Sequence, residues 1–181
     1  NRFTYQESNL EGYIQYAQKW KHIQATAGMR IEYMQTIGTL ESYLDGKLME
    51  ENKNNHTRLF PNLSISYNLN NKAKLTLAYS KRQDKARYED LNPIEYLLDE
   101  LTYWKGNPFI QPQINHRISL DYTKNNLSVM LSYNQLNNYF TQLPDAYKKD
   151  CIVMTTKNIG KQKQLALDLI YNKRLTSWWD V

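Results

Sequence analysis

Apolar and polar side chains alternate with a period of two along much of this chain. In residues 23–33, IQATAGMRIEY, the odd positions carry Ile, Ala, Ala, Met, Ile and Tyr, and the even positions carry Gln, Thr, Gly, Arg and Glu. Successive side chains of a strand point to opposite faces of its sheet, so this pattern predicts a strand with one apolar and one polar face. The same alternation recurs in residues 59–69, 74–82, 114–122, 127–135 and 164–172. It is weaker in residues 9–18, and residues 177–181 are a possible start of an eighth strand.

Tyrosine ends many of the apolar rows. The six tyrosines in such positions are Tyr33, Tyr67, Tyr79, Tyr122, Tyr133 and Tyr171. Aromatic rings with a polar tip are favoured where lipid tails meet water, so their placement favours a membrane barrel over a soluble sandwich. The alternative stays open that tyrosine is simply a good strand residue.

The polar rows also carry charge. Their members include Arg30, Glu32, Arg82, Asn115, Arg117, Asp121 and Asp168. A dry core would leave such groups unpaired at a cost of several kcal/mol each, whereas a water-filled or protein-plugged interior removes that cost. A sheet whose polar face is simply solvated is the alternative.

Short and long connections alternate strictly between the predicted strands. The short ones are polar and turn-like, such as KWKH near residue 20 and TKNN near residue 125. The long ones cover residues 35–58, about 83–112 and about 138–163. An up-and-down barrel with short periplasmic turns and long extracellular loops explains this alternation. The sequence therefore predicts an all-β, antiparallel transmembrane β-barrel segment of about seven or eight strands.

The middle long connection has a distinctive composition, YEDLNPIEYLLDELTYWKGNP at residues 88–108. Each proline restricts the asparagine before it, so residues 92–93 and 107–108 are predicted to be fixed corners. Residues 93–104 are predicted to form a short helix with apolar side chains on one side. The carboxylates of this connection are interpreted as solvated or salt-bridged loop residues. They are Glu89, Asp90, Glu95, Asp99 and Glu100.

Four aromatic residues of this connection are candidate ligand contacts. Rings of this kind stack on sugars or aromatic chelators, although they equally serve as packing residues. The candidates are Tyr88, Tyr96, Tyr103 and Trp104.

The composition of the chain excludes several kinds of functional site. It has 181 residues, a formal net charge of +5, three histidines and one cysteine, Cys151. A single cysteine excludes a disulfide within the chain and a cysteine zinc site, and no histidine has a partner at ligand spacing. No catalytic motif and no nucleic-acid signature accompany the scattered basic residues. We therefore expect no enzyme activity, no metal, no cofactor and no nucleic-acid partner.

The stretch from residue 79 to residue 112 closely resembles the TonB-dependent receptor barrels common in Bacteroidetes. A strand ending in Tyr-Ser is followed by Tyr-x-x-Leu-Asn-Pro, an aromatic and acidic patch, and Gly-Asn-Pro. The matching residues are Tyr79, Ser80, Tyr88, Leu91, Asn92, Pro93, Tyr96, Asp99, Gly106, Asn107, Pro108 and Pro112. Further similarities lie at Gly28, Arg30, Glu32, Asn158 and Gly160. The chain departs from the family pattern at Lys85 and Ala86, where Arg and Pro are usual, and at Ile110, where Leu is common.

This resemblance implies a bacterial outer-membrane receptor that imports a large, scarce nutrient such as a siderophore, a corrinoid or a glycan. Its implied partners are outer-membrane lipid, an unknown nutrient ligand, the rest of the barrel with its plug, and TonB. Residues 1–181 are expected to be one partial barrel domain, because such transporters have about 22 strands and neither a plug nor a signal peptide is seen here. A non-transporting structural or adhesion barrel and a soluble β-sandwich binding module are the alternatives.

Overall fold

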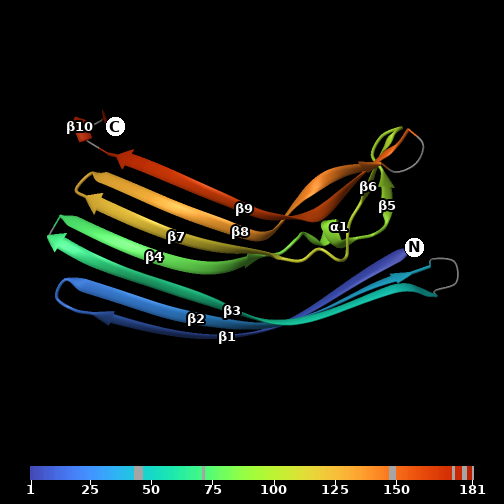
Figure 1. Ribbon diagram of the computed structural model, residues 1–181, viewed down its shortest axis with the longest axis horizontal. Helices are drawn as coiled ribbons and strands as arrows, with labels where there is room; N and C mark the ends of the chain where they lie inside the picture. Colours follow the sequence, from blue (N-terminus) through green and yellow to red (C-terminus); the bar gives the residue numbers. More distant parts are fainter. Residues whose placement is uncertain (43–46, 71, 147–149, 173, 177–178, 181) are drawn as a thin grey trace.

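Seven long strands form one antiparallel meander in the computed structural model, which describes residues 1–42, 47–70, 72–146, 150–172, 174–176 and 179–180 (Figure 1). Each long strand pairs with its neighbour in chain order. The strands are β1 (Arg2–Lys19), β2 (Ile23–Glu41), β3 (Leu48–Asn70), β4 (Ala73–Asp84), β7 (Gln113–Lys124), β8 (Leu127–Ala146) and β9 (Ile152–Tyr171). The predicted all-β, up-and-down architecture is confirmed.

Short elements complete the fold. The connection between β4 and β7 contains helix α1 (Tyr88–Leu91) and strands β5 (Glu95–Leu97) and β6 (Thr102–Lys105). Strand β6 runs parallel to β9, so the sheet has the order β1-β2-β3-β4-β7-β8-β9-β6-β5. Near the C-terminal end, β10 (Arg174–Thr176) pairs with β11 (Trp179–Asp180). The strand predicted at 177–181 lies mostly outside the described residues, and its described part, β11, belongs to this separate pair.

The register of the meander gathers the apolar positions of all seven strands on one face. One lateral row runs through Ile65, Leu77, Leu120, Leu131 and Leu167. Most of these side chains are exposed, whereas polar side chains on the opposite face are buried: Leu77 is 50% exposed and Ser66 only 8%. Side chains converge on the concave face of a bowed sheet, so the polar face is the concave one. We call the two sides the apolar face and the polar face.

The apolar face has the height of a membrane. On β2 it runs from Ile23 to Tyr33, with exposed odd positions and mostly buried even positions between residues 28 and 36. Ten residue steps at about 3.4 Å each span about 34 Å along the strand. At a strand tilt of about 45° this corresponds to about 24 Å, close to the apolar band of about 25 Å in outer-membrane barrels. No helix among the described residues is long and apolar enough to cross a membrane.

The structure corrects the expected form of two long connections. Residues 35–58 and 138–163 were both expected as loops, but β2 continues to Glu41, β3 begins at Leu48, β8 continues to Ala146 and β9 begins at Ile152. These strands therefore extend far beyond the apolar band. Outside lipid neither face must be apolar, so the alternation that identifies a strand in the sequence is lost while the backbone pairing continues.

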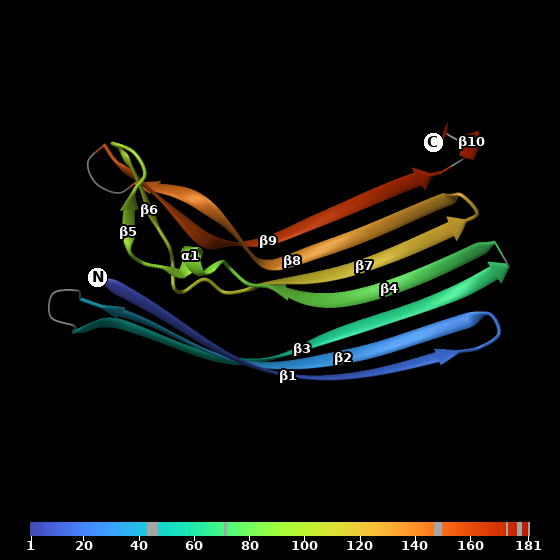
Figure 2. The same ribbon diagram turned by 180° about the vertical axis from the view of Figure 1, so that it is seen from behind.

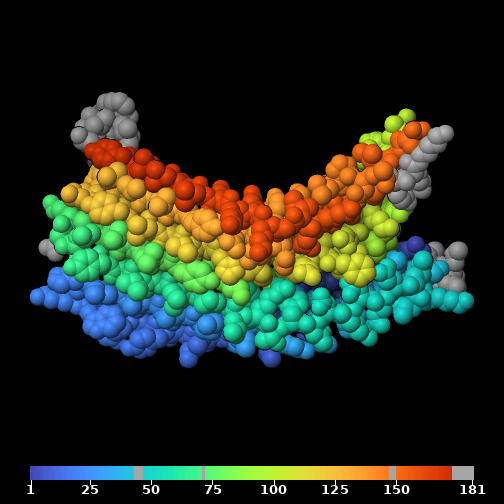
Figure 3. All heavy atoms as spheres, viewed as in Figure 1, coloured from blue at the N-terminus to red at the C-terminus, as the bar shows by residue number. Residues whose placement is uncertain are grey.

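The sheet splits at its long-connection end. Pairing between β3 and β4 stops at Asn62 and Ser80, although β3 continues with β2 and β4 continues with β7. Beyond this point β3 and the β8–β9 pair diverge, and the β4–β7 connection lies between them in both views (Figures 1 and 2). The space-filling view shows the bowed profile that results, with the strands ordered from the N-terminal to the C-terminal end (Figure 3).

The apolar face predicts a contrast between two neighbouring residues of β4. We expect Leu77→Arg to destabilise the full-length protein by about 2–4 kcal/mol, because it places a cation against hydrocarbon. The side chain of residue 76 lies on the polar face, opposite Asp121. Thr76→Arg should therefore lower the free energy of unfolding by no more than about 1 kcal/mol, because it removes only the hydroxyl contact with Ser66. Urea unfolding in lipid vesicles measures both values, and equal costs would contradict a lipid-facing position for Leu77.

Candidate functional site

Residues 85–112, which we call the strap, form a folded bridge across the split in the sheet. On one side the Asn52 side-chain amide of β3 donates to the Pro108 carbonyl at 2.9 Å. On the other side Asn107 donates to the Thr156 carbonyl of β9 at 3.3 Å, and the Thr156 hydroxyl donates to Asp90 at 3.1 Å. Side-chain amides and hydroxyls thus replace the missing strand pairing, and they fix the strap to both walls of the split.

Close backbone contacts fold the strap on itself. The Gly106 amide donates to the Asn92 carbonyl at 2.9 Å, and the Asn107 amide donates to the Asp90 carbonyl at 2.6 Å. A Cβ atom on Gly106 would lie 2.5 Å from the Asn92 carbonyl oxygen and 2.7 Å from the Asp90 carbonyl oxygen. The predicted corner at residue 92 is extended, with φ −76° and ψ 112°. Only glycine fits at residue 106, which gives a physical role to the Gly-Asn-Pro motif.

Asn158 of β9 fixes the last part of the strap. Its side-chain amide donates to the carbonyls of Gln111 and Asn138, at 2.9 and 2.7 Å, while its oxygen accepts from the Gln111 amide at 2.9 Å. Asn138 and Gly160 have positive φ angles, 55° and 120°, where the β8–β9 register shifts. One asparagine therefore ties the strap to a β-bulge, a device that redirects a strand locally.

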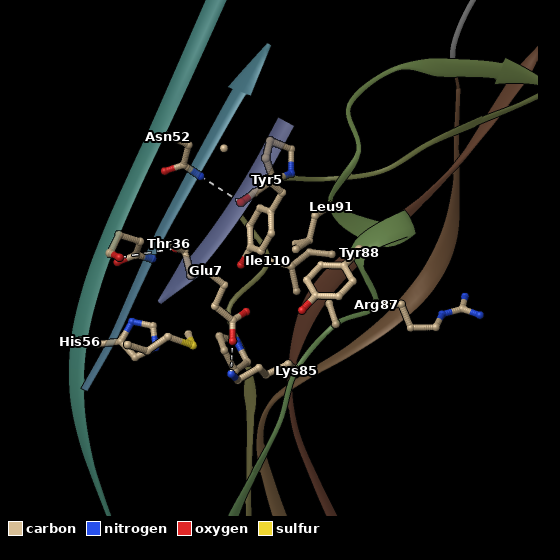
Figure 4. A pocket seen from close by; sticks show the side chains of 16 residues that line it. Tyr5, Glu7, Thr36, Asn52, His56, Lys85, Arg87, Tyr88, Leu91 and Ile110 are labelled. Carbon is tan, nitrogen blue, oxygen red and sulfur yellow. Dashed lines mark hydrogen bonds and ion pairs between the residues drawn. The ribbon is translucent and has the colours of Figure 1, made fainter. Parts of the chain in front are cut away.

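A pocket of about 200 Å³ lies between the strap and the polar face of β1–β3 (Figure 4). Tyr5, Thr36 and His56 line it from the strands, and Lys85, Tyr88 and Leu91 line it from the strap. We call it the strap pocket. The Tyr5 and Tyr88 rings lie 5.5 Å apart between centroids. Two rings, a lysine, an imidazole and several amides suit the binding of a polar aromatic or sugar-like group.

A charge cluster stabilises the wall of the strap pocket. Lys85 forms an ion pair with Glu7, and its Nζ atom lies 3.8 Å from Glu32, which also lies 3.7 Å from Arg30. Glu32 is buried, and its Oε1 atom has no hydrogen-bond partner among the described residues. Lys85, one of the departures from the family pattern, thus neutralises acids of two other strands. Burial, followed by the negative charge of Glu7, raises the pKa of the Tyr5 hydroxyl.

His56 adds a titratable group to the strap pocket. It lies beyond Leu59, the last outward apolar residue of the band on β3, and therefore outside the membrane-spanning part. Burial, followed by the positive charges of Arg58 and Lys85, lowers the pKa of its imidazole, and the opposing effect of Glu7 is smaller. The Nε2 atom has no hydrogen-bond partner among the described residues.

The structure separates the four aromatic residues predicted to contact ligand. Only Tyr88 lines the strap pocket. Tyr96 and Trp104 contact each other across the β5–β6 hairpin, with centroids 5.8 Å apart, and Tyr103 and Trp104 pair with β9. A role in ligand binding stays a prediction for all four.

The helix prediction for the strap is wrong. The helix expected at 93–104 is the β5–β6 hairpin, since β6 satisfies the open edge of β9, and the helix of the strap lies instead at Tyr88–Leu91. Asp90 is salt-bridged, as the sequence indicated, with Arg87 at 3.2 Å, and it is also buried at 7% exposure against Thr156. In both cases a partner distant in the sequence determines the local structure.

The remaining family-motif residues have mostly structural positions. Tyr79 lies on the apolar face opposite Ile118, and Ser80 lies on the polar face opposite Arg117. Leu91 and Pro112 belong to the strap; Leu91 is buried, and both line the strap pocket. Sequence reasoning missed Tyr5, Glu7 and His56 as pocket residues. Their β1 and upper β3 segments lack the alternation of the band, so no signal in the sequence marked their shared face.

The Gly106 contacts predict a strong effect of a single methyl group. We expect Gly106→Ala to destabilise the strap by about 1–3 kcal/mol. The new Cβ would collide with backbone atoms, which can move only if the surrounding chain moves with them. Gly38→Ala is the control, since its Cβ would meet only ring atoms at 3.5 Å. Hydrogen exchange of residues 88–112 measures the effect, and unchanged protection in Gly106→Ala would refute the tight approach.

The lowered pKa of His56 predicts an acid-sensitive strap pocket. Because the folded state resists protonation, its stability is full above the ordinary pKa of 6.5 and falls as the pH drops below that value toward the folded pKa. We expect His56→Gln to remove part of this loss between pH 7.5 and 5. Denaturant unfolding at both pH values tests this, with His22→Gln, at the opposite end of the sheet, as the control. An identical pH dependence of wild type and His56→Gln would contradict it.

Comparison with solved structures shows the same fold in outer-membrane proteins. The chain is similar to the Serratia marcescens hemophore receptor HasR, with a TM-score of 0.72 and 13% identity over 92% of this chain and 32% of that one. It is similar to the copper transporter OprC, with a TM-score of 0.69 and 12% identity over 95% and 27%. The siderophore receptor PirA from Pseudomonas aeruginosa gives a TM-score of 0.57 and 11% identity over 97% and 41%.

The chain spans between about a quarter and two fifths of the length of these three proteins. At such low identity the likeness shows the fold alone. No curated protein matches the sequence. A family model, described as the outer membrane protein beta-barrel family, matches residues 1–181. With its apolar face toward lipid and its polar face inward, this chain belongs to the outer membrane protein beta-barrel family of the bacterial outer membrane.

Proposed function

We propose that residues 1–181 form part of the barrel wall of a TonB-dependent receptor that imports a large, scarce nutrient. The observation that carries this proposal is the position of the strap pocket. It opens on the polar face at the long-connection end of the sheet, the end that faces outward in barrels of this type. A nutrient arriving from outside meets this pocket before it meets the rest of the inner wall.

The chemistry of the strap pocket supports binding without covalent change. Tyr5 and Tyr88 offer rings, Lys85 offers a charge that is already balanced, and Asn52 and Asn54 offer amides. Among the described residues no group of three or more His, Cys, Asp or Glu side chains is placed to hold a metal ion. A siderophore, a corrinoid or a glycan carries the rings, hydroxyls or amides that such a pocket recognises.

Energy for transport would come from TonB through a plug domain inside the completed barrel. The likeness to a hemophore receptor, a copper transporter and a siderophore receptor supports a receptor role, since these proteins share the fold. The chemistry of import then consists of binding, release and passage, with the barrel wall as a rigid guide.

Growth on a limiting nutrient tests the proposal. A deletion strain would be supplied in turn with an iron chelate, a corrinoid or a glycan as its only source of iron, cobalamin or carbon. We expect the full-length gene to restore growth on at least one of them, and only in the presence of TonB. Normal growth of the deletion strain on all of them would refute nutrient import and favour a structural or adhesion barrel.

A matched pair of tyrosines tests the strap pocket itself. We expect Tyr88→Ala to weaken nutrient binding about two- to tenfold, the equivalent of a stacking contribution of about 0.5–1.5 kcal/mol. Tyr16→Ala is the control, because Tyr16 and Tyr88 are both 66% exposed but Tyr16 lies on the apolar face near the short turns. Titration of the purified receptor with the nutrient measures both, and equal affinities would exclude Tyr88 from the contact.

A further inference from the structure

A second cavity, separate from the strap pocket, lies on the polar face lower along the strands. It has a volume of about 290 Å³ and is bordered by β3, β4 and β7. Its polar lining consists of Asn62, Ser80, Arg82, Asn115, Arg117 and Ser119. None of these residues lines the strap pocket. We call it the arginine cavity.

The two arginines of this cavity are close neighbours. Ser80 pairs with Arg117 and Arg82 pairs with Asn115, so the arginines occupy diagonal positions on adjacent strands. Diagonal neighbours of an antiparallel pair lie about 7–8 Å apart, within reach of two long side chains. Two like charges at neighbouring positions create a positive potential at this part of the polar face.

In the described part of the chain neither Arg82 nor Arg117 forms an ion pair. Arg117 instead donates to the Met130 sulfur at 3.6 Å. Of the acids nearby, Asp84 accepts a hydrogen bond from Gln113 and Asp121 accepts one from Ser119. Arg30 and Lys85, elsewhere on the polar face, form ion pairs with Glu11 and Glu7. The arginine cavity thus differs from that region in holding two neighbouring cations without an ion pair among the described residues.

The rest of the lining suits an anion. The Asn62 amide and the Ser80 hydroxyl add donors beside the two guanidinium groups. Asn115 also lines the cavity, and its buried Oδ1 atom has no hydrogen-bond partner among the described residues. Turning the Asn115 amide over would place its NH2 group, with two N–H donors, at this position.

We propose that the arginine cavity binds an oxyanion of the carboxylate or phosphate type through Arg82 and Arg117. Guanidinium groups bind such anions through two parallel N–H···O hydrogen bonds. The volume of the cavity fits one such group and not a whole nutrient, so the oxyanion is either part of the imported molecule or a carboxylate elsewhere in the same protein. This inference rests on one part of the proposed function, namely that the polar face borders the interior of a barrel.

Chemical modification of arginine distinguishes these two sources. Full-length receptor in detergent is treated with phenylglyoxal, and labelling of each arginine is measured by peptide mass spectrometry. If a free anion binds, both cavity arginines label in buffer alone, and citrate or inorganic phosphate protects them. If a carboxylate of the protein occupies the cavity, neither labels at low salt and both label in 1 M NaCl, where charge interactions are screened within about 3 Å. Arg2, which is exposed and lies outside the cavity, serves as the control that labels throughout.

Two results would overturn the proposal. One is labelling in buffer without protection by either anion, and the other is an absence of labelling at both salt concentrations, which indicates steric covering. These results are independent of nutrient uptake. If the gene restores growth but neither anion protects the arginines, only the anion site is refuted. If an anion protects the arginines but no nutrient is taken up, only the import function is refuted.

Matched substitutions sharpen the test. In a receptor that binds free citrate, Arg82→Gln and Arg117→Gln should each raise the citrate concentration for half-protection of the remaining arginine at least tenfold. Arg82→Lys should recover part of the loss, because it keeps the charge without the paired N–H donors. Arg2→Gln, which removes an exposed arginine that lines neither cavity, should leave the value unchanged. A purely structural role predicts lower stability of the Gln variants, whereas relief of repulsion predicts equal or higher stability in urea unfolding.

Discussion

The structure depends on one constraint: backbone N–H and C=O groups that lie in hydrocarbon must bond to a neighbouring strand. Unsatisfied groups cost several kcal/mol each in lipid, so the chain runs as an uninterrupted meander through the depth of the band. Continuous pairing fixes the register, and the register places Ile65, Leu77, Leu120, Leu131 and Leu167 in one lateral row. Both faces follow from this, because a shift of one residue in any strand would carry its apolar side chains to the polar side.

Above the band the constraint relaxes, and the fold changes accordingly. β3 and β4 separate beyond Asn62 and Ser80, which would leave two open edges and a gap. The strap closes the gap with side-chain hydrogen bonds from Asn52, Asn107 and Asn158, and β6 pairs with the upper part of β9. An unpaired edge invites association with other chains, so the hairpin also protects this edge. The strap pocket is a consequence of this closure, since its walls come from the polar face on one side and from the strap on the other.

The charged side chains of the polar face form two groups. Near the strap, Lys85, Arg30, Glu7, Glu11 and Glu32 form a connected and largely balanced group, which fixes the strap against β1 and β2. Lower on the wall, Arg82 and Arg117 line a cavity without forming an ion pair among the residues that the structure describes. Balanced charges hold a structure in place, whereas unbalanced charges attract an anion from elsewhere. The two cavities of the inner wall therefore differ in chemistry although they lie on neighbouring strands.

The sequence by itself determined the strands that cross the band, their two faces, the short turns and the family, because alternation is enforced wherever one face meets lipid and the other does not. It also marked the Asn-Pro corners, because each proline restricts the residue before it locally. Gly106 was marked only by the family resemblance, and its restriction comes from the close approach of the Asp90 and Asn92 backbone. Tertiary structure alone decided the rest. The extensions of β2, β3, β8 and β9 lose the alternation outside lipid, and the hairpin replaces the expected helix only because β9 offers an edge. The meeting of Tyr5, Glu7 and His56 with Lys85 and Tyr88 depends on pairing across the sheet and on the fold of the strap, which no local pattern encodes.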